Sequence, residues 1–590
     1  MRCYANVCSI ASARSAADAG WVPQALSLRL LVAALVAVVA VIATAGPLRS
    51  QLAGQGVGRG HALVAPGPLS PSRAGALEPL APTLPDGGPN GAAIWVHGDR
   101  SPAAAVALFR AAGIPASVVR TFGEARRHPL VLSWPRTNFG RRLRVQVRAY
   151  ARHGGTFLAV APSPAVRAGI GAMRTAFFTR LVQVPERGLE SGGHLRDSQI
   201  AALRRFWAAT PGGFRLGDAP GGARSALVLL HDVRGAQALR AARELVRRER
   251  KTGVRATYVL QTRYLADARG AKLVGPALAQ LVRAVRAASA GVVAGGVAGG
   301  PLVTVPRGDA GEIYPTYAAA YASSTEVDGE TLSGELRISR YVLDELGAGA
   351  VDAFRGVSGS TPRGFAAVAE DTGIDVDATL PVDAAGGSFP FWQAQADGLE
   401  RRLLRFPVAV DDVPGEGPAA ALAAAYVALR RNHGSGAPTL VELTPDRHGC
   451  AAAVERALLA DTPPDVWRGT LDRLAGFWDA RAGVALDARP LGAGRGWLVR
   501  LGSEGSAGGQ SLVAPFRVAR ATGADGHPLE VRGGNRVVLP EFRGQTAIVV
   551  VPTRAKVNRS GDPASSAFRQ AATRLPRQLT LLSSSAHVCR

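Results

Sequence analysis

Two adjacent residues whose side chains bind divalent metals, His231 and Asp232, end a strongly apolar stretch of the sequence. Residues 228–233 read VLLHDV, which predicts a buried strand. An amphipathic helix over 236–250 and a second apolar strand over 253–260 are predicted to follow. An imidazole and a carboxylate at the end of a strand are candidate metal ligands. The alternative is that they cap a nearby loop or helix.

Further segments follow this strand-helix-strand pattern. Residues 253–260 read GVRATYVL, 354–362 read FRGVSGSTP, 377–380 read DATL, 404–408 read LRFPV and 465–471 read DVWRGTL. In this order and spacing they resemble the polysaccharide deacetylase family, carbohydrate esterase family four. The resemblance covers about residues 225–487.

The resemblance implies a distorted (β/α) barrel that removes N-acetyl groups from a cell-envelope polysaccharide. In that family one Asp and two His hold a divalent metal, which polarises the acetamide carbonyl and lowers the pKa of bound water. A second Asp acts as base and a late-strand His as acid. For this sequence the resemblance implies Asp232 and Arg355 as catalytic residues, with Arg355 orienting the base. It implies His231 and Asp232 as metal ligands.

The first departure from the family pattern is a missing carboxylate. The stretch His231-Asp232-Val233-Arg234 offers one carboxylate where the family has two. In one alignment His231 replaces the base and Asp232 is the metal ligand. In the other, Asp232 is the base and Arg234 replaces the ligand. Arg355 has a structural alternative too, an ion pair with Asp232.

The second departure is the loss of the histidines. The two metal histidines of the family align with Gly296 and Gly300, which have no side chain to offer. The late-strand histidine aligns with Thr444, and His448 lies four residues further along. The sequence leaves two alternatives for a cofactor, a weakly held divalent metal such as zinc or none.

Two functions compete on these observations. The first is a pseudoenzyme that binds a cell-envelope glycan or organises a polysaccharide assembly, and the glycines favour it. The alternative is an active metal-dependent N-deacetylase with unusual ligands. Candidate substrate contacts are Tyr314, Tyr317, Ser358 and Trp392. The aromatic side chains could stack on sugar rings, and ordinary packing is their alternative role.

The rest of the chain predicts an α/β protein of several parts. Strands alternating with helices predict a small parallel α/β domain over 91–220, followed by the deacetylase-like barrel over 225–487. Short apolar runs without helices predict a β-sandwich over 490–552. Residues 553–590 are predicted to be a polar tail.

The N-terminal region predicts a membrane attachment. Residues 30–46 form an apolar stretch after a flank, 1–29, that carries three arginines, and 47–90 are a Gly/Pro-rich linker. We expect a signal anchor or transmembrane helix in a bacterial cell membrane, with the flank in the cytoplasm and the bulk periplasmic or extracellular. Secretion after cleavage near Ala45 is the alternative. Cys450 and Cys589 would then lie where a disulfide can persist.

Charge alone suggests a polyanionic partner, but the composition weakens that reading. The 590 residues carry a formal net charge of +24, and all but three of the 69 basic residues are arginine. The arginines are scattered rather than gathered in a patch, so we expect no nucleic-acid partner. The expected partners are a cell-envelope polysaccharide and, through the N-terminal helix, the membrane.

Overall fold

The computed structural model of the chain describes residues 91–553, except for the segments 99–100, 135–139, 161–174, 179–196, 263–275, 299, 310, 313–316, 318–319, 322–326, 358, 360, 395–399, 412–416, 446–450 and 493–494. Within this described part, no helix has the length and apolar character needed to cross a bilayer. The predicted anchor, linker and polar tail lie outside it, as do Tyr314, Ser358, His448, Cys450 and Cys589.

A five-stranded parallel sheet forms the first folded part, in the order β2-β1-β3-β4-β5. Its strands are β1 Ala92–Val96, β2 Ala116–Val119, β3 Leu130–Trp134, β4 Thr156–Val160 and β5 Thr175–Phe178. The helices are α2 Ala103–Ala112, α3 Phe122–Ala125, α4 Arg141–Arg152 and α6 Asp197–Ala208. The predicted alternation of strand and helix is present here, and the apolar runs of β1, β3 and β4 are short and largely buried.

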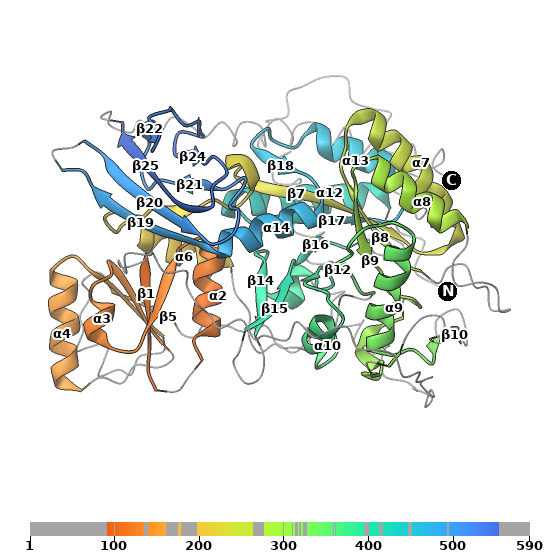
Figure 1. The fold of residues 1–590 in the computed structure, drawn as a ribbon, viewed down its shortest axis with the longest axis horizontal. Coiled ribbons are helices and arrows are strands. Elements are labelled where there is room, and N and C mark those ends of the chain that lie inside the picture. The colour runs from red at the N-terminus through yellow and green to blue at the C-terminus, as the bar shows by residue number, and fades with distance from the viewer. Residues whose placement is uncertain are drawn as a thin grey trace, which may run out of the picture. The chain divides into compact units, whose positions relative to one another are not determined.

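A larger sheet, curled into a half-barrel, forms the centre of the chain (Figure 1). Its order is β14-β15-β13-β12-β9-β8-β7-β17-β16, with β18 also on β7, and only the pair β14/β15 is antiparallel. The strands are β7 Ser225–Val233, β8 Thr257–Leu260, β9 Gly291–Ala294, β12 Ala353–Phe354, β13 Val376–Asp377, β14 Phe391–Ala394, β15 Glu400–Arg405, β16 Val408–Val410, β17 Thr439–Leu443 and β18 Val466–Arg468. A mixed α/β fold of this kind agrees with the predicted α/β class.

Helices cover one face of this sheet, with α7, α8 and α9 lying beside β7, β8 and β9 (Figure 1). The helices on this face are α7 Gly235–Thr252, α8 Pro276–Ala287, α9 Leu332–Glu345, α10 Phe365–Asp371, α12 Pro418–Ser435 and α13 Ala451–Ala460. Two further helices, α11 Val382–Ala385 and α14 Leu471–Ala482, contribute instead to the core cluster on the other face. Two short 3₁₀ turns, Pro220–Gly222 and Leu302–Thr304, and a small hairpin of β10 Ala320–Tyr321 and β11 Val327–Asp328 complete this region. The predicted strand over 253–260 begins late, at Thr257, because Gly253 (φ 73°) caps α7 in the left-handed region.

The last part consists of antiparallel strands in two four-stranded sheets, β19-β20-β25-β22 and β23-β24-β21-β6. The strands are β6 Arg215–Leu216, β19 Val484–Pro490, β20 Trp497–Ser503, β21 Ser511–Val513, β22 Val518–Gly523, β23 Val531–Arg532, β24 Arg536–Val538 and β25 Gly544–Pro552. Both sheets contribute to one hydrophobic cluster. Strand β6 belongs to a segment that precedes the central sheet, and two residues are too short a pattern for the sequence to show this pairing.

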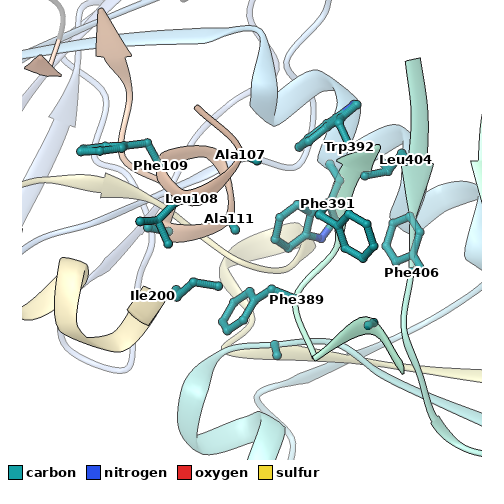
Figure 2. Packing of buried hydrophobic residues seen from close by; sticks show 14 of the residues in the cluster. Ala107, Leu108, Phe109, Ala111, Ile200, Phe389, Phe391, Trp392, Leu404 and Phe406 are labelled. Carbon is teal, nitrogen blue, oxygen red and sulfur yellow. The ribbon is translucent and has the colours of Figure 1, made fainter. Parts of the chain in front are cut away.

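One core cluster extends from the N-terminal sheet into the central sheet (Figure 2). Phe109 of α2 and Ile200 of α6 lie in it together with Phe389, Trp392 and Phe406. All five side chains are at most 4% exposed. A second cluster fills the space between the central sheet and its helices. The central strands are therefore buried on both faces, as expected for parallel strands.

Candidate functional site

Strand β7 carries both predicted metal ligands, but its geometry separates them. Val228 and Leu230 belong to the first core cluster, whereas Leu229 packs in the cluster that includes helices α7 and α8. Successive side chains of a strand point to opposite faces. Asp232 therefore lies on the face of Val228 and Leu230, called here the inner face. His231 lies on the other, the helix face.

Charged side chains gather on the inner face where parallel strands end. Asp232 is the last residue but one of β7, and Arg234 directly follows that strand. Arg355 follows β12, Asp411 follows β16 and Glu442 lies on β17. The carboxyl ends of parallel strands meet at one edge of a sheet, which is where α/β proteins commonly bind ligands. We call these five residues the inner-face ionic cluster.

Ion pairs connect the members of this cluster. Asp232 pairs with Arg234, and Arg355 pairs with Glu442. Arg355 Nη2 also lies 3.1 Å from Asp411 Oδ1, and its Nη1 donates a hydrogen bond to the carbonyl oxygen of Ala378 at 2.6 Å. The predicted ion pair of Arg355 with Asp232 is not found, and the guanidinium group of Arg355 instead contacts Glu442 and Asp411.

The electrostatics of the inner-face ionic cluster are nearly balanced. Burial lowers the pKa of Arg355, and the carboxylates of Asp411 and Asp232 oppose that shift. Arginine remains charged under these conditions, so three carboxylates face two guanidinium groups. Asp232, Arg355 and Glu442 are buried, while the side chains of Arg234 and Asp411 are 30% and 34% exposed. Three members of the cluster are therefore shielded from solvent, and Arg234 and Asp411 are the members that solvent can reach.

The residues present do not fit a metal held by one aspartate and two histidines at this place. Gly296 occupies the left-handed region with φ 86°. A Cβ at Gly300 would lie 2.5 Å from Glu330 Oε2, so a side chain there would have to displace that carboxylate. Among the histidines that the structure describes, none pairs with Asp232, and Arg234 already occupies its carboxylate.

We expect Gly296→Ala to lower the free energy of unfolding by about 1–2 kcal/mol, because a Cβ is disfavoured in the left-handed region. Gly296→His should cost at least as much and release no acetate from an acetylated oligosaccharide. Urea denaturation and an acetate assay measure the two effects. Gly253→Ala is the matched comparison, because Gly253 is also in the left-handed region but has open space around it. It should lose a similar amount of stability from backbone strain alone. An unchanged stability in Gly296→Ala would contradict this assignment.

The helix face of β7 holds a second polar group around His231. His231 Nε2 lies 2.8 Å from Glu249 Oε1 of α7 and 3.6 Å from Glu455 Oε2 of α13. Tyr258 of β8 donates its hydroxyl hydrogen to Glu249 Oε2 at 2.7 Å. Burial alone would lower the pKa of His231, but the charge and hydrogen bond of Glu249, together with Glu455, raise it to about 10. Burial raises the pKa of Glu455.

The two aromatic candidates that the structure describes, Tyr317 and Trp392, are buried and contact residues outside the inner-face ionic cluster. Tyr317 is 2% exposed and donates a hydrogen bond to Glu335 Oε1 at 3.1 Å, while its oxygen accepts one from the Thr331 amide. Trp392 is 4% exposed and packs under Arg110 of α2, whose guanidinium carbon lies 5.2 Å from the ring. Neither side chain offers a free face to a sugar ring in this structure. Both support packing.

Sequence reasoning missed four residues that the structure places around its candidates. They are Glu249, Asp411, Glu442 and Glu455. A usable signal existed for Glu442, an acidic residue inside the apolar run 439–443. Glu249 also stood out as an acid within a basic run. The sequence pattern showed that these acids need partners but not which ones.

Comparison with known proteins gives limited support. No family model and no curated protein matches the chain. Among solved structures, a polysaccharide deacetylase candidate from Mycobacterium smegmatis is 16% identical, with 45% of this chain and 94% of that chain covered and a TM-score of 0.34. A CE4 family pseudoenzyme from Bacillus anthracis is 14% identical, with 42% and 65% covered and a TM-score of 0.26. An alpha-L-fucosidase from Paenibacillus thiaminolyticus is 9% identical, with 79% and 49% covered and a TM-score of 0.20. Likenesses this distant do not assign the chain to a family, so the functional argument depends on the residues themselves.

Proposed function

We propose that this chain is a deacetylase-like protein that binds a cell-envelope glycan without hydrolysing it. The observation that carries the proposal is the pairing on the inner face. Arginines occupy the carboxylates of Asp232 and Glu442, at the strand ends where a deacetylase would need a metal and a free base. A carboxylate that is paired with a guanidinium is a poor metal ligand and a poor general base.

The same cluster has groups suited to sugar hydroxyls. Carboxylate oxygens accept hydrogen bonds and guanidinium groups donate them, and a hydroxyl can do both. Arg234 and Asp411 are the partly exposed members, so they are the groups through which a glycan would first contact the cluster. Recognition would depend on hydrogen bonds rather than on stacking, because Tyr317 and Trp392 are buried.

The location in the cell is part of the proposal. The apolar segment 30–46, preceded by arginines, supports a single-pass anchor with the folded part outside the cytoplasm. In that compartment the excess of arginine faces anionic envelope polymers. Secretion after cleavage near Ala45 would place the folded part in the same compartment.

The test measures binding and hydrolysis in parallel. The purified chain, with added zinc or cobalt, is incubated with acetylated chitooligosaccharide or peptidoglycan fragments, and acetate release and binding are both measured. We expect binding without acetate release. We also expect Asp411→Asn to weaken binding about tenfold, the equivalent of one hydrogen bond to a charged group.

A matched control separates this effect from general loss of charge. Asp525→Asn removes an exposed carboxylate in a turn of the last part and should leave binding unchanged. Acetate release that disappears in Asp232→Asn would instead establish the active N-deacetylase. Absence of both binding and release would reject a glycan as the ligand.

A further inference from the structure

The helix face of β7 holds three metal-ligating side chains that the proposed function does not use. His231 of β7, Glu249 of α7 and Glu455 of α13 are 0%, 1% and 6% exposed. We call them the buried His–Glu–Glu cluster. They come from three different elements, and Asp232 of the inner-face ionic cluster lies on the opposite side of the strand.

The distances within the buried His–Glu–Glu cluster are close to those of a coordination sphere. One ligand atom from each side chain lies within 4.8 Å of the others. His231 Nε2 is 2.8 Å from Glu249 Oε1 and 3.6 Å from Glu455 Oε2. Tetrahedral zinc with bonds of about 2.0–2.1 Å separates its ligand atoms by about 3.3 Å. Small side-chain rotations would bring the three atoms to that separation.

The neighbouring groups orient this cluster as outer partners orient metal ligands. His231 Nδ1 lies 3.3 Å from the carbonyl oxygen of Leu443, so Nδ1 can keep its N–H while Nε2 exchanges its proton for a metal ion. Tyr258 donates to Glu249 Oε2 at 2.7 Å, which leaves Oε1 facing Nε2. Ligating histidines almost always donate their other N–H to a carbonyl or carboxylate, and ligating carboxylates are themselves hydrogen-bonded.

One acceptor in the cluster has no donor. Glu455 Oε2 is buried and has no hydrogen-bond partner among the described residues, and it points toward His231 at 3.6 Å. No arginine or lysine of the described chain pairs with Glu249 or Glu455. The Nε2–H group of His231 can serve Glu249 Oε1 but leaves Glu455 Oε2 without a donor, whereas a divalent cation in place of that proton would contact all three ligand atoms.

We propose that His231, Glu249 and Glu455 bind one divalent transition-metal ion, for which Zn²⁺ is the best match. A neutral imidazole and two carboxylates neutralise a divalent cation, and zinc accepts this mixed nitrogen and oxygen set. The second oxygen of a carboxylate or a water completes the coordination. The ion stabilises the fold by joining β7 to α7 and α13, and this role is independent of glycan binding.

The metal content of the full chain tests the proposal. The purified protein is stripped with a chelator, reconstituted with Zn²⁺ and dialysed, and bound zinc is measured by elemental analysis while Tm is recorded. We expect about one zinc per chain and a Tm that falls on stripping and recovers with Zn²⁺. Glu455→Gln should lower the affinity for zinc at least about tenfold, and Tyr258→Phe, which removes only the outer hydrogen bond, about tenfold.

The control variants come from the inner-face ionic cluster. Asp232→Asn and Asp411→Asn should retain zinc in full, because both side chains lie off the helix face. Zinc lost from Asp232→Asn and retained in Glu455→Gln would move the metal to the inner face and overturn the proposal. Folded wild-type protein that takes up no zinc, with a Tm unaffected by chelator, would overturn it as well. The cluster would then be held by protons shared between His231 and the glutamates.

Discussion

Replacing Asp218 by asparagine is expected to lower the free energy of unfolding by about 3–5 kcal/mol, the cost of leaving a buried charge without its partner. Asp218 is 4% exposed and forms ion pairs with three arginines. Arg204 lies at 2.5 Å, Arg215 at 3.0 Å and Arg481 at 3.2 Å. Asparagine keeps the size of the side chain but removes the only negative charge in these pairs.

The loss should affect more than one part of the fold. Arg204 of α6 also donates to the carbonyl oxygens of Ala112 and Ser435, and Arg481 of α14 donates to that of Arg110. These bonds satisfy carbonyl groups at the C-terminal ends of α2 and α12, where positive charge is favourable. Burial and the nearby charge of Arg215 lower the pKa of Arg204 to about 9, and the charge of Asp218 opposes that shift. Without Asp218 the buried arginines would repel one another.

Urea denaturation of Asp218→Asn and of the wild-type protein measures this loss. Asp525→Asn, in an exposed turn, is the control and should change stability by less than about 0.5 kcal/mol. A loss below about 1 kcal/mol in Asp218→Asn would mean that the ion pairs contribute little.

The same carboxylate makes stability depend on pH. Burial favours the neutral form of Asp218, but Arg204, Arg215 and Arg481 outweigh it and lower the pKa below its usual range. The stabilisation is therefore complete above about pH 4, where the unfolded carboxylate is ionised, and is lost as the pH falls through the lower folded value. The destabilisation in Asp218→Asn should shrink correspondingly in acid.

Trp392→Ala is expected to lower the free energy of unfolding by about 3–5 kcal/mol, as for other large aromatic side chains removed from a core. Trp392 lies on β14 with Phe391, and both belong to the cluster that includes Phe109 of α2 (Figure 2). The protein has little freedom to close the resulting space, because Trp392 pairs with Leu404 across β14 and β15 and the sheet holds both backbones in place.

This variant also separates packing from sugar stacking. If Trp392 only packs, the folded protein binds glycan as the wild type does, and thermal unfolding shows the whole effect. Val427→Ala on α12, at a side chain 64% exposed, is the matched control and should change stability by less than about 0.5 kcal/mol. Glycan binding lost at a temperature where Trp392→Ala is still folded would restore the stacking role.

Local patterns predicted much of the framework. The apolar runs that became β1, β3, β4 and β7 and the amphipathic stretch that became α7 are each recognisable within one short window. Strands β6, β12 and β13 have only two residues each, and their pairing depends on neighbours far away in the sequence. A pattern needs several residues to show its period, so periodicity could not show these strands, and only the family resemblance pointed to the segments that begin at Phe354 and Asp377.

The candidate site was likewise predictable from the sequence only in part. His231, Asp232 and Arg355 could be singled out because polar residues at the ends of apolar runs are unusual. The loss of side chains at Gly296 and Gly300 was also visible in the sequence, and the structure explains it through a left-handed backbone and a close carboxylate.

The sequence by itself determined which groups are present: a histidine and an aspartate side by side on a buried strand, an arginine further along, and glycines where histidines were expected. Only the tertiary structure decided their partners. Alternation along β7 sends His231 to Glu249 and Glu455 and leaves Asp232 with Arg234. Ion pairs between residues as distant in sequence as Arg355 and Glu442 depend on how the strands are ordered in the sheet, and that order is a property of the whole fold.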